Sequence, residues 1–134
     1  MSTKIFVNLP VKDLNRSMDF FTSLGWSFNR QFTDENAACL VITDDIYAML
    51  LVEPFFQSFT KKEIVDATRS TEAIVALAVD SREQVDDLVD RAFAAGAAPA
   101  NETMEQGPMY NRSFCDLDGH MWEVLYMDPA AIQQ

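Results

Sequence analysis

The chain has 134 residues, of which 49% are hydrophobic and 23% are charged, a balance that fits one folded domain and excludes a disordered chain. Ten Lys and Arg against twenty-one Asp and Glu give a formal net charge of −11, which disfavours nucleic acid and anionic membrane surfaces as partners. No apolar run approaches the ~20 residues of a membrane span, and the first residues lack the pattern of a secretory signal. We therefore expect a cytoplasmic protein.

The first half of the chain predicts a strand, a helix and three further strands. Alternating apolar residues predict a strand over 4–11. Asp13 is the expected N-cap of a helix that Gly25 ends. Further strands are expected near 26–32, 39–43 and 46–53, with a turn at 44–45 between the last two.

The second half of the chain predicts the same order of elements. A strand is expected over 74–79, and Ser81 with Gln84 resembles a capping box at the start of a helix that Gly96 ends. Strands are expected near 98–103, 109–115 and 121–127, and residues 116–119 form the expected last turn.

The two halves align when one is shifted against the other, so that Val7 matches Val75 and Leu9 matches Leu77. This repeat predicts an α+β fold of two tandem βαβββ units, at about 3–53 and 72–128, within a single domain of 1–134. The connector, 54–71, is expected to contain a small helix that begins near Thr60.

One face of each leading strand is expected to lack a covering helix. In the first unit this face carries Phe6 and Asn8, and in the second it carries Ile74 and Ala76. Two curved sheets of this kind enclose a cavity, and we expect ligand chemistry there.

Two segments resemble a known superfamily. Residues 11–21, VKDLNRSMDFF, are similar to the opening, and residues 114–124, FCDLDGHMWEV, to the closing strand–turn–strand, of the vicinal oxygen chelate proteins, the glyoxalase/bleomycin resistance/dioxygenase group. The resemblance covers the whole chain and implies paired βαβββ units, a small-molecule ligand and a homodimer. More narrowly, the chain resembles bacterial proteins labelled predicted lactoylglutathione lyases.

Metal-dependent members of that superfamily place one ligand at each of four strand positions. The resemblance puts these positions on Phe6, Leu50, Ile74 and Glu123. Three apolar side chains and one carboxylate are too few donors for a divalent cation, so the resemblance implies no conventional metal site and no cofactor.

Alternatives to that reading remain open. A shift in register brings Leu51 or Glu53 inward instead of Leu50. Asn8, Glu53 and His120 are further donors with which a metal site could be rebuilt beside Glu123. His120 has the opposite strand parity from Glu123 and is the one histidine in the sequence, so a site with two imidazoles from one chain is excluded.

Glu123 is the candidate catalytic residue, because a desolvated carboxylate can act as a general acid or base near neutral pH. The alternative is a scaffold residue paired with Arg112 or another donor. Arg112 could instead bind an anionic ligand group or lie at the surface, and Tyr110 could line the site or pack against the sheet.

Asn8 and His120 complete the candidate ligand-binding residues, with Phe6, Leu50, Ile74, Tyr110 and Arg112. Asn8 could bind a ligand carbonyl or hydroxyl group, or an internal water. His120 follows a turn, where an imidazole commonly hydrogen-bonds the backbone. Cys39 and Cys115 are expected to be free thiols in a reducing compartment.

Three functions follow. The first is a glyoxalase-related lyase or isomerase that acts on a small oxygenated substrate, with Glu123 as base. The second is a non-catalytic protein of the bleomycin-resistance type, which sequesters a small ligand. The third is a metalloenzyme with shifted ligands, so whether the chain is an enzyme stays open.

Overall fold

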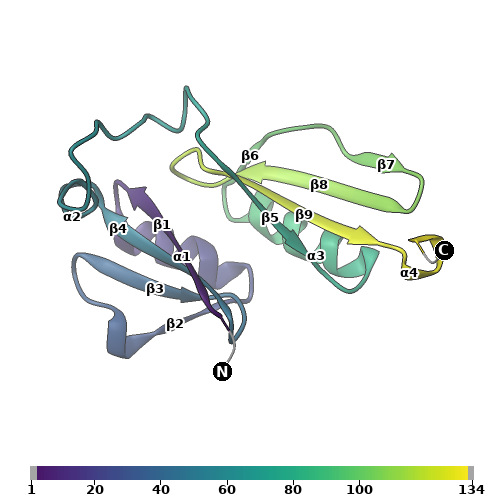
Figure 1. The fold of residues 1–134 in the computed structure, drawn as a ribbon, viewed down its shortest axis with the longest axis horizontal. Coiled ribbons are helices and arrows are strands. Elements are labelled where there is room, and N and C mark those ends of the chain that lie inside the picture. The colour runs from purple at the N-terminus through teal and green to yellow at the C-terminus, as the bar shows by residue number, and fades with distance from the viewer. Residues whose placement is uncertain (1–2, 133–134) are drawn as a thin grey trace. The chain divides into compact units, whose positions relative to one another are not determined.

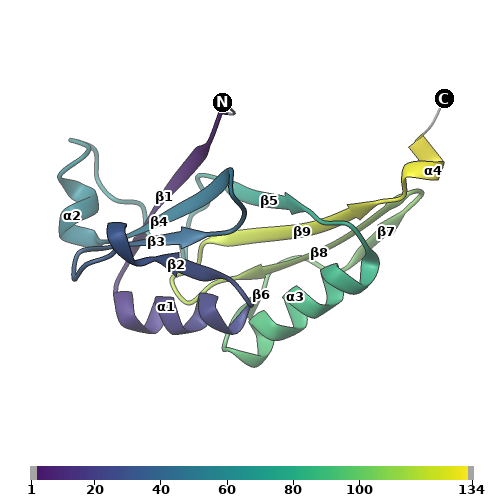
Figure 2. The same ribbon diagram turned by 90° about the horizontal axis from the view of Figure 1, so that it is seen from below.

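The computed structural model describes residues 3–132, and the chain divides into two compact units, Met1–Asp66 and Ala67–Gln134. Each unit contains a β-sheet with a helix on one face (Figures 1 and 2). That the two units form a single domain stays a prediction of the sequence. No helix within 3–132 is long and apolar enough to cross a membrane.

The first unit contains four strands, two α-helices and one 3₁₀ helix. Its elements are β1 (Ile5–Val11), α1 (Leu14–Ser23), β2 (Ser27–Asn29), the 3₁₀ helix η1 (Arg30–Phe32), β3 (Ala37–Val41), β4 (Ile46–Val52) and α2 (Glu53–Gln57). The sheet order is β1-β4-β3-β2, in which β1 runs parallel to β4 and the other pairs are antiparallel.

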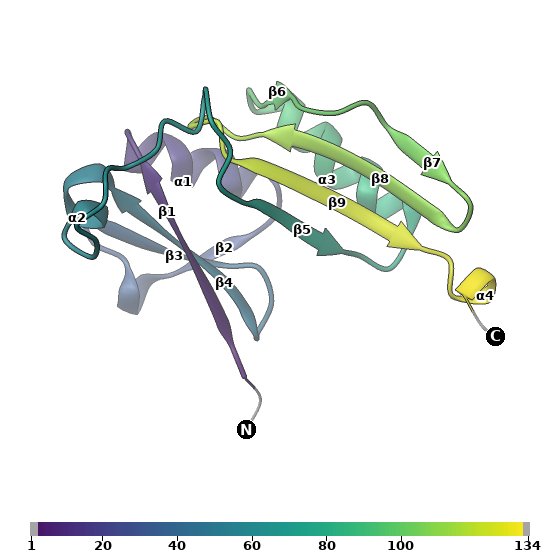
Figure 3. The same cartoon turned by 45° about the horizontal axis from the view of Figure 1, so that its top comes forward.

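The second unit contains five strands. Its elements are β5 (Ile74–Ala78), α3 (Arg82–Ala94), β6 (Ala98–Pro99), β7 (Met104–Gln106), β8 (Met109–Cys115), β9 (Met121–Met127) and α4 (Pro129–Ile132). The sheet order is β5-β9-β8-β6, and β7 also pairs with β8 (Figure 3). Strand β5 runs parallel to β9, just as β1 runs parallel to β4.

The common strand order confirms the predicted α+β fold and its duplication. In each unit the first strand lies beside the last strand of the unit, and the helix after the first strand crosses one face of the sheet (Figure 2). The expected helix starts are also confirmed. Asp13 Oδ1 accepts a hydrogen bond from the Arg16 backbone at 3.1 Å, and Ser81 Oγ accepts one from Gln84 at 3.1 Å.

The hydrophobic core of each unit lies between its helix and its sheet. In the first unit the strand side chains Ala38, Leu40, Ala48 and Leu50 are at most 1% exposed, as is Phe21 of α1. In the second unit Phe114, Trp122 and Val124 of the sheet and Val85, Val89 and Ala92 of α3 are 0% exposed. Burial of this apolar surface is the main stabilising term for each unit.

Three local predictions were wrong. The strand expected near 26–32 is only Ser27–Asn29, and the 3₁₀ helix η1 follows it. The helix after β4 begins at Glu53 rather than near Thr60, because Pro54 occupies the first turn, where its missing N–H costs nothing. The Thr60 hydroxyl instead accepts a bond from the Lys62 backbone in a tight turn. The strand expected over 98–103 is only Ala98–Pro99, and a separate strand, β7, follows it.

Candidate functional site

Each sheet has a second face, opposite its helix, which we call the open face. In the first unit the register places Phe6 beside Tyr47 and Asn8 beside Met49 on this face. The rings of Phe6 and Tyr47 stack at 4.6 Å between centroids, and Phe6 is 48% exposed. The Asn8 amide donates to the Phe6 carbonyl at 3.1 Å, which holds the amide against its own strand.

Part of the first open face is buried. Ala37, Cys39 and Leu51 lie on it, yet none is more than 8% exposed. Helix α2 contacts β1 and β4 here, and η1 contacts β3. The exposed corner of the face is formed by Phe6, Asn8 and their two neighbours on β4, and Ser27 is also exposed at the other edge of the sheet.

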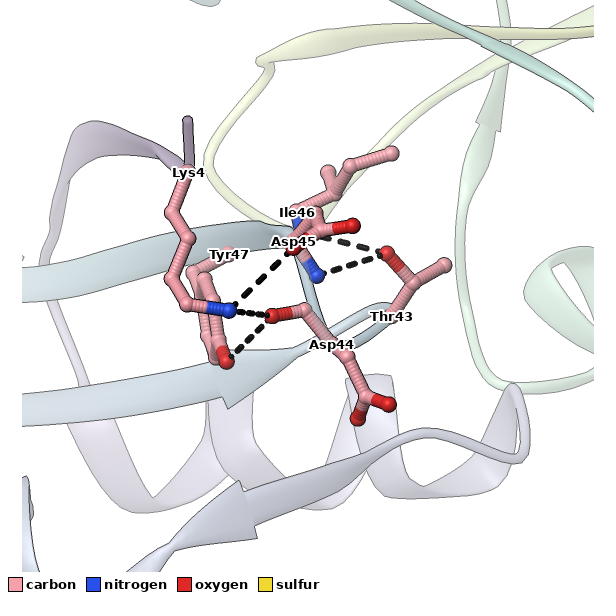
Figure 4. Close-up of polar contacts among 6 residues, drawn as sticks. All are labelled: Lys4, Thr43, Asp44, Asp45, Ile46 and Tyr47. Atoms are coloured by element: carbon pink, nitrogen blue, oxygen red, sulfur yellow. Dashed lines mark hydrogen bonds and ion pairs between the residues drawn. The ribbon is translucent and has the colours of Figure 1, made fainter. Parts of the chain in front are cut away.

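Polar contacts fix this corner at the β3–β4 turn (Figure 4). The Tyr47 hydroxyl donates to the Asp44 carbonyl at 2.8 Å. Lys4 donates to the same carbonyl and forms an ion pair with Asp45 at 3.2 Å. The hydrogen bond to Asp45 raises the pKa of Lys4 above its ordinary value.

The expectation that Leu50 shares the face of Phe6 is wrong. Leu50 pairs with Leu9, on the side of the sheet that α1 covers, and is 0% exposed. Leu51, the alternative that a shifted register allowed, lies on the face of Phe6. Glu53 lies in α2, beyond the end of β4.

The second open face carries Glu123 at its centre. The register sets Glu123 between Ala76 of β5 and Ser113 of β8. Asn111, one step along β8 on the same face, donates its amide hydrogen to Glu123 Oε1 at 3.3 Å. Ile74 is on this face as expected and is 48% exposed.

The hydroxyl of Ser113 is already committed to the backbone. The hydroxyl oxygen accepts a hydrogen bond from the backbone N–H of Asn101 at 2.9 Å. It also donates a longer hydrogen bond, of 3.4 Å, to the backbone carbonyl of Asn101. Among the residues that the structure describes, Asn111 is the hydrogen-bonding partner recorded for Glu123. The amide therefore orients one carboxylate oxygen.

Tyr110 and Arg112 lie on the opposite face from Glu123, against α3. Arg112 forms ion pairs with Asp86 at 2.9 Å and Asp90 at 3.0 Å. The Tyr110 hydroxyl donates to Asp86 at 2.5 Å. Arg112 therefore does not pair with Glu123. Tyr110 and Arg112 attach α3 to the sheet and do not face the predicted ligand surface.

These contacts have electrostatic consequences. The hydrogen bond from Tyr110, followed by that from Arg112, holds the pKa of Asp86 below its ordinary value. The same bond, together with burial, raises the pKa of Tyr110. Both shifts favour the ionised Asp86 and the protonated Tyr110, the states in which this bond forms.

His120 belongs to the turn before β9. Its backbone N–H donates to Asp116 Oδ1 at 3.0 Å, and the Asp118 N–H donates to the same oxygen at 3.0 Å. The Trp122 indole donates to Asp116 Oδ2 at 3.0 Å. Burial raises the pKa of the Asp116 carboxyl, although these donors and the nearby imidazole favour its charged form.

The donors on the open faces do not fit a divalent metal ion. Phe6 and Ile74 offer no lone pairs, and Glu123 is joined by one amide and by a hydroxyl that the backbone already uses. Within residues 3–132 no group of three or more His, Cys, Asp and Glu side chains comes together as a metal site would require.

Asn111 and Asp116 are the residues near the candidate site that the sequence analysis missed. Counting back from the 116–119 turn places Asn111 and Ser113 on the face of Glu123, because paired positions in a hairpin share a face. The signal for Asp116 is its place at the start of an Asx-type turn, where a short carboxylate accepts backbone N–H groups.

Comparisons with known proteins agree with this fold. Residues 3–43 match the model of the bleomycin resistance protein-like N-terminal family. Among curated proteins none matches the chain.

Three solved structures illustrate the similarity. The hypothetical protein SA1046 from S. aureus is 30% identical, with 94% of this chain and 95% of that chain covered and a TM-score of 0.77. A glyoxalase/bleomycin resistance protein/dioxygenase family enzyme from Burkholderia phytofirmans PsJN has 18% identity, coverage of 94% and 99%, and a TM-score of 0.77. The fosfomycin resistance protein FosX from Listeria monocytogenes has 19% identity, 99% coverage of both chains and a TM-score of 0.68. Together with the duplicated topology, these matches show that the chain has the fold of the glyoxalase/bleomycin resistance/dioxygenase proteins.

Proposed function

We propose that this protein is a glyoxalase-related lyase or isomerase for a small organic substrate, that it works without the conventional metal site, and that Glu123 is its general base. The position of Glu123 carries the proposal. It is the carboxylate of an otherwise uncharged sheet face, oriented by Asn111 and flanked by the short side chain of Ala76.

The proposed chemistry is a proton transfer. The Glu123 carboxylate removes the proton from a carbon that carries a hydroxyl group and lies beside a carbonyl group, which gives an enediolate and a protonated Glu123. The carboxylic acid then returns this proton to the former carbonyl carbon, while the hydroxyl proton passes to the former carbonyl oxygen, so that the carbonyl group moves by one carbon and Glu123 is ionised again. Asn111 holds one oxygen of the carboxylate through its amide, so the other oxygen is available to the substrate. Correct placement of such a base contributes ~10²–10⁴-fold to a reaction rate.

The ligand contacts in this proposal come from the open faces. In the second unit Ile74 supplies apolar surface beside Glu123. In the first unit, taken by itself, Phe6 and Asn8 stay the candidate ligand contacts. Tyr110, Arg112 and Leu50 have no direct contact with the substrate in this proposal, because they face the helices. His120 supports the turn through its backbone.

A second candidate function is sequestration of a small ligand without catalysis. It is favoured by the match of residues 3–43 to a bleomycin resistance protein-like model. Apolar open faces suit binding as well as they suit catalysis, and sequestration makes no demand on the chemistry of Glu123.

A homodimer in the cytoplasm belongs to the same proposal. The superfamily resemblance supports the dimer, and the free thiols of Cys39 and Cys115 fit a reducing compartment. The acidic composition argues against nucleic acid as a partner. Light scattering on the purified protein at several concentrations tests the dimer.

The test of the proposed activity compares wild type with Glu123→Gln after treatment with EDTA. Both proteins are offered a panel of small carbonyl compounds that includes the hemithioacetal of methylglyoxal and glutathione. We expect Glu123→Gln to lower kcat/KM by ~10²-fold or more, while the dissociation constant of the substrate changes little. Glu102→Gln, which removes the same charge from an exposed site, is the control.

Three outcomes discriminate among the functions. Equal turnover by wild type and Glu123→Gln removes the base from the proposal. Turnover that requires added nickel or zinc overturns the metal-free site. Binding of a panel member without any turnover favours sequestration.

A further inference from the structure

Glu123 is the one carboxylate among the strand residues of the second open face, as the described part of the chain shows it. No Lys or Arg within residues 3–132 forms an ion pair with it, and the strand residues of the second open face include no cation. The arginines of α3 and β8 are engaged on the other face. Arg82 pairs with Glu105, Arg91 with Asp87, and Arg112 with Asp86 and Asp90.

The surroundings of Glu123 are apolar and adaptable. Four of the seven methionines in the sequence, Met104, Met109, Met121 and Met127, lie on this one face. Unbranched thioether side chains adjust to ligands of different shape. We call this surface the methionine face.

Space beside the carboxylate comes from the edge strand. Ala76 and Ala78, both exposed, present only methyl groups next to Glu123 and Leu125. A ligand that contacts the carboxylate can therefore occupy the space above Ala76 and Ala78 of β5 while it packs against Met121 and Leu125 of β9.

The net charge of the second unit reinforces this local charge. Twelve of the twenty-one acidic residues, but four of the ten Lys and Arg, lie in 67–134. An excess of one sign raises the local concentration of ligands of the opposite sign and repels anions.

From these observations we propose that the ligand of the methionine face is an organic cation, a protonated amine or quaternary ammonium group on an apolar body. The cationic group pairs with the Glu123 carboxylate, and the body packs on the methionines. An inorganic cation fits less well, because one carboxylate and one amide cannot replace its water shell. This inference rests on the proposed role of the open face, and it also predicts that cationic carbonyl compounds are better substrates than the anionic glutathione hemithioacetal.

The test uses three naphthalene probes of similar size. They are (1-naphthylmethyl)trimethylammonium, its neutral isostere 1-neopentylnaphthalene, and the anion 1-naphthylacetate. Binding to the full-length protein is measured by fluorescence titration at 50 and 500 mM NaCl. For wild type at low salt we expect the cation to bind about tenfold more tightly than the neutral isostere and the anion to bind most weakly.

Variants locate the effect. Glu123→Gln is expected to remove the preference for the cation, whereas Glu102→Gln retains it. Ala76→Met fills the space beside the carboxylate, and we expect it to weaken the binding of the cation and the binding of the neutral isostere by the same factor. The melting temperature of each variant shows that it remains folded.

The outcomes separate this inference from the proposed function. If the neutral isostere binds wild type as tightly as the cation, or if the two charge variants weaken the cation equally, the cation inference is overturned while ligand binding on the open face stands. If no probe binds wild type, or if Ala76→Met leaves binding unchanged, the proposed use of this face fails as well.

Discussion

The two units have one topology but differ in what their open faces offer a ligand. In the first unit, Ala37, Cys39 and Leu51 of that face are buried, and a stacked aromatic pair marks an exposed corner. In the second unit the face carries methionines around a single carboxylate. Duplication has thus kept the strand order, which the core requires, and changed the residues opposite the helix, which the core does not constrain.

The units also differ in how the turn before the last strand is held. In the first unit the exposed Thr43 hydroxyl accepts from the backbones of Asp45 and Ile46, at 3.2 and 3.1 Å (Figure 4). In the second unit the buried carboxylate of Asp116 accepts three N–H bonds. The second turn therefore depends on one side chain that water cannot replace.

Removal of that side chain has the largest expected effect. Asp116→Ala leaves three N–H groups, two from the backbone and the Trp122 indole, without their acceptor, and we expect a loss of about 3–5 kcal/mol in the free energy of unfolding. Urea denaturation followed by tryptophan fluorescence measures it.

The matched variant in the first unit is Asp44→Ala. Asp44 accepts hydrogen bonds through its backbone carbonyl, and its carboxylate points away from these partners (Figure 4). We expect a change within about 0.5 kcal/mol. Equal losses for the two variants would contradict the contrast between the turns.

The sequence predicted the duplication and the side-chain alternation within each strand, because apolar periodicity and caps are local signals. It did not predict which faces of neighbouring strands coincide. The pairing of β1 with β4 is parallel, so no turn length sets its register, and Leu50 was placed on the wrong face. The β8–β9 register depends on the exact length of the 116–120 turn, which decides that Ser113 rather than Arg112 stands beside Glu123.

The same turn requires a glycine at 119, because the backbone of residues 67–68 lies too close to it for a side chain. Gly119 has φ +92°, and a Cβ built there would lie 2.7 Å from the Thr68 backbone nitrogen and 2.8 Å from Ala67. Because both contacts are with backbone, Gly119→Ala forces the 67–68 segment or the turn to move. We expect a loss of about 2–3 kcal/mol in unfolding free energy.

Gly107→Ala measures the cost of a side chain at positive φ alone, without the steric clash that is expected for Gly119→Ala. Gly107 also has positive φ, +58°, but nothing lies within 4 Å of its added Cβ. We expect a loss of about 1 kcal/mol, the ordinary cost of a side chain in that conformation. If both variants lose the same stability in urea, the close approach of the 67–68 segment is not what selects glycine at 119.

The smallest predicted effect concerns the attachment of the helices. Helix α1 buries Leu14, Phe20 and Phe21, whereas α3 adds the bonds that Tyr110 and Arg112 make with Asp86. Since these bonds lower the pKa of folded Asp86 relative to the unfolded chain, their stabilisation is present above the unfolded pKa of about 4. It is lost as the pH falls through the folded value.

Asp86→Asn tests the contribution of these bonds to stability. The informative result is how the loss of unfolding free energy depends on pH, and not how large the loss is. The difference in unfolding free energy between wild type and the variant should be constant above about pH 5 and should shrink as the pH falls below about 4. Leu14→Ala on α1 removes buried apolar surface and no titratable group, so the difference between wild type and this variant should show no such trend. A pH-independent difference for Asp86→Asn would mean that the charge of Asp86 does not help to hold α3 against the sheet.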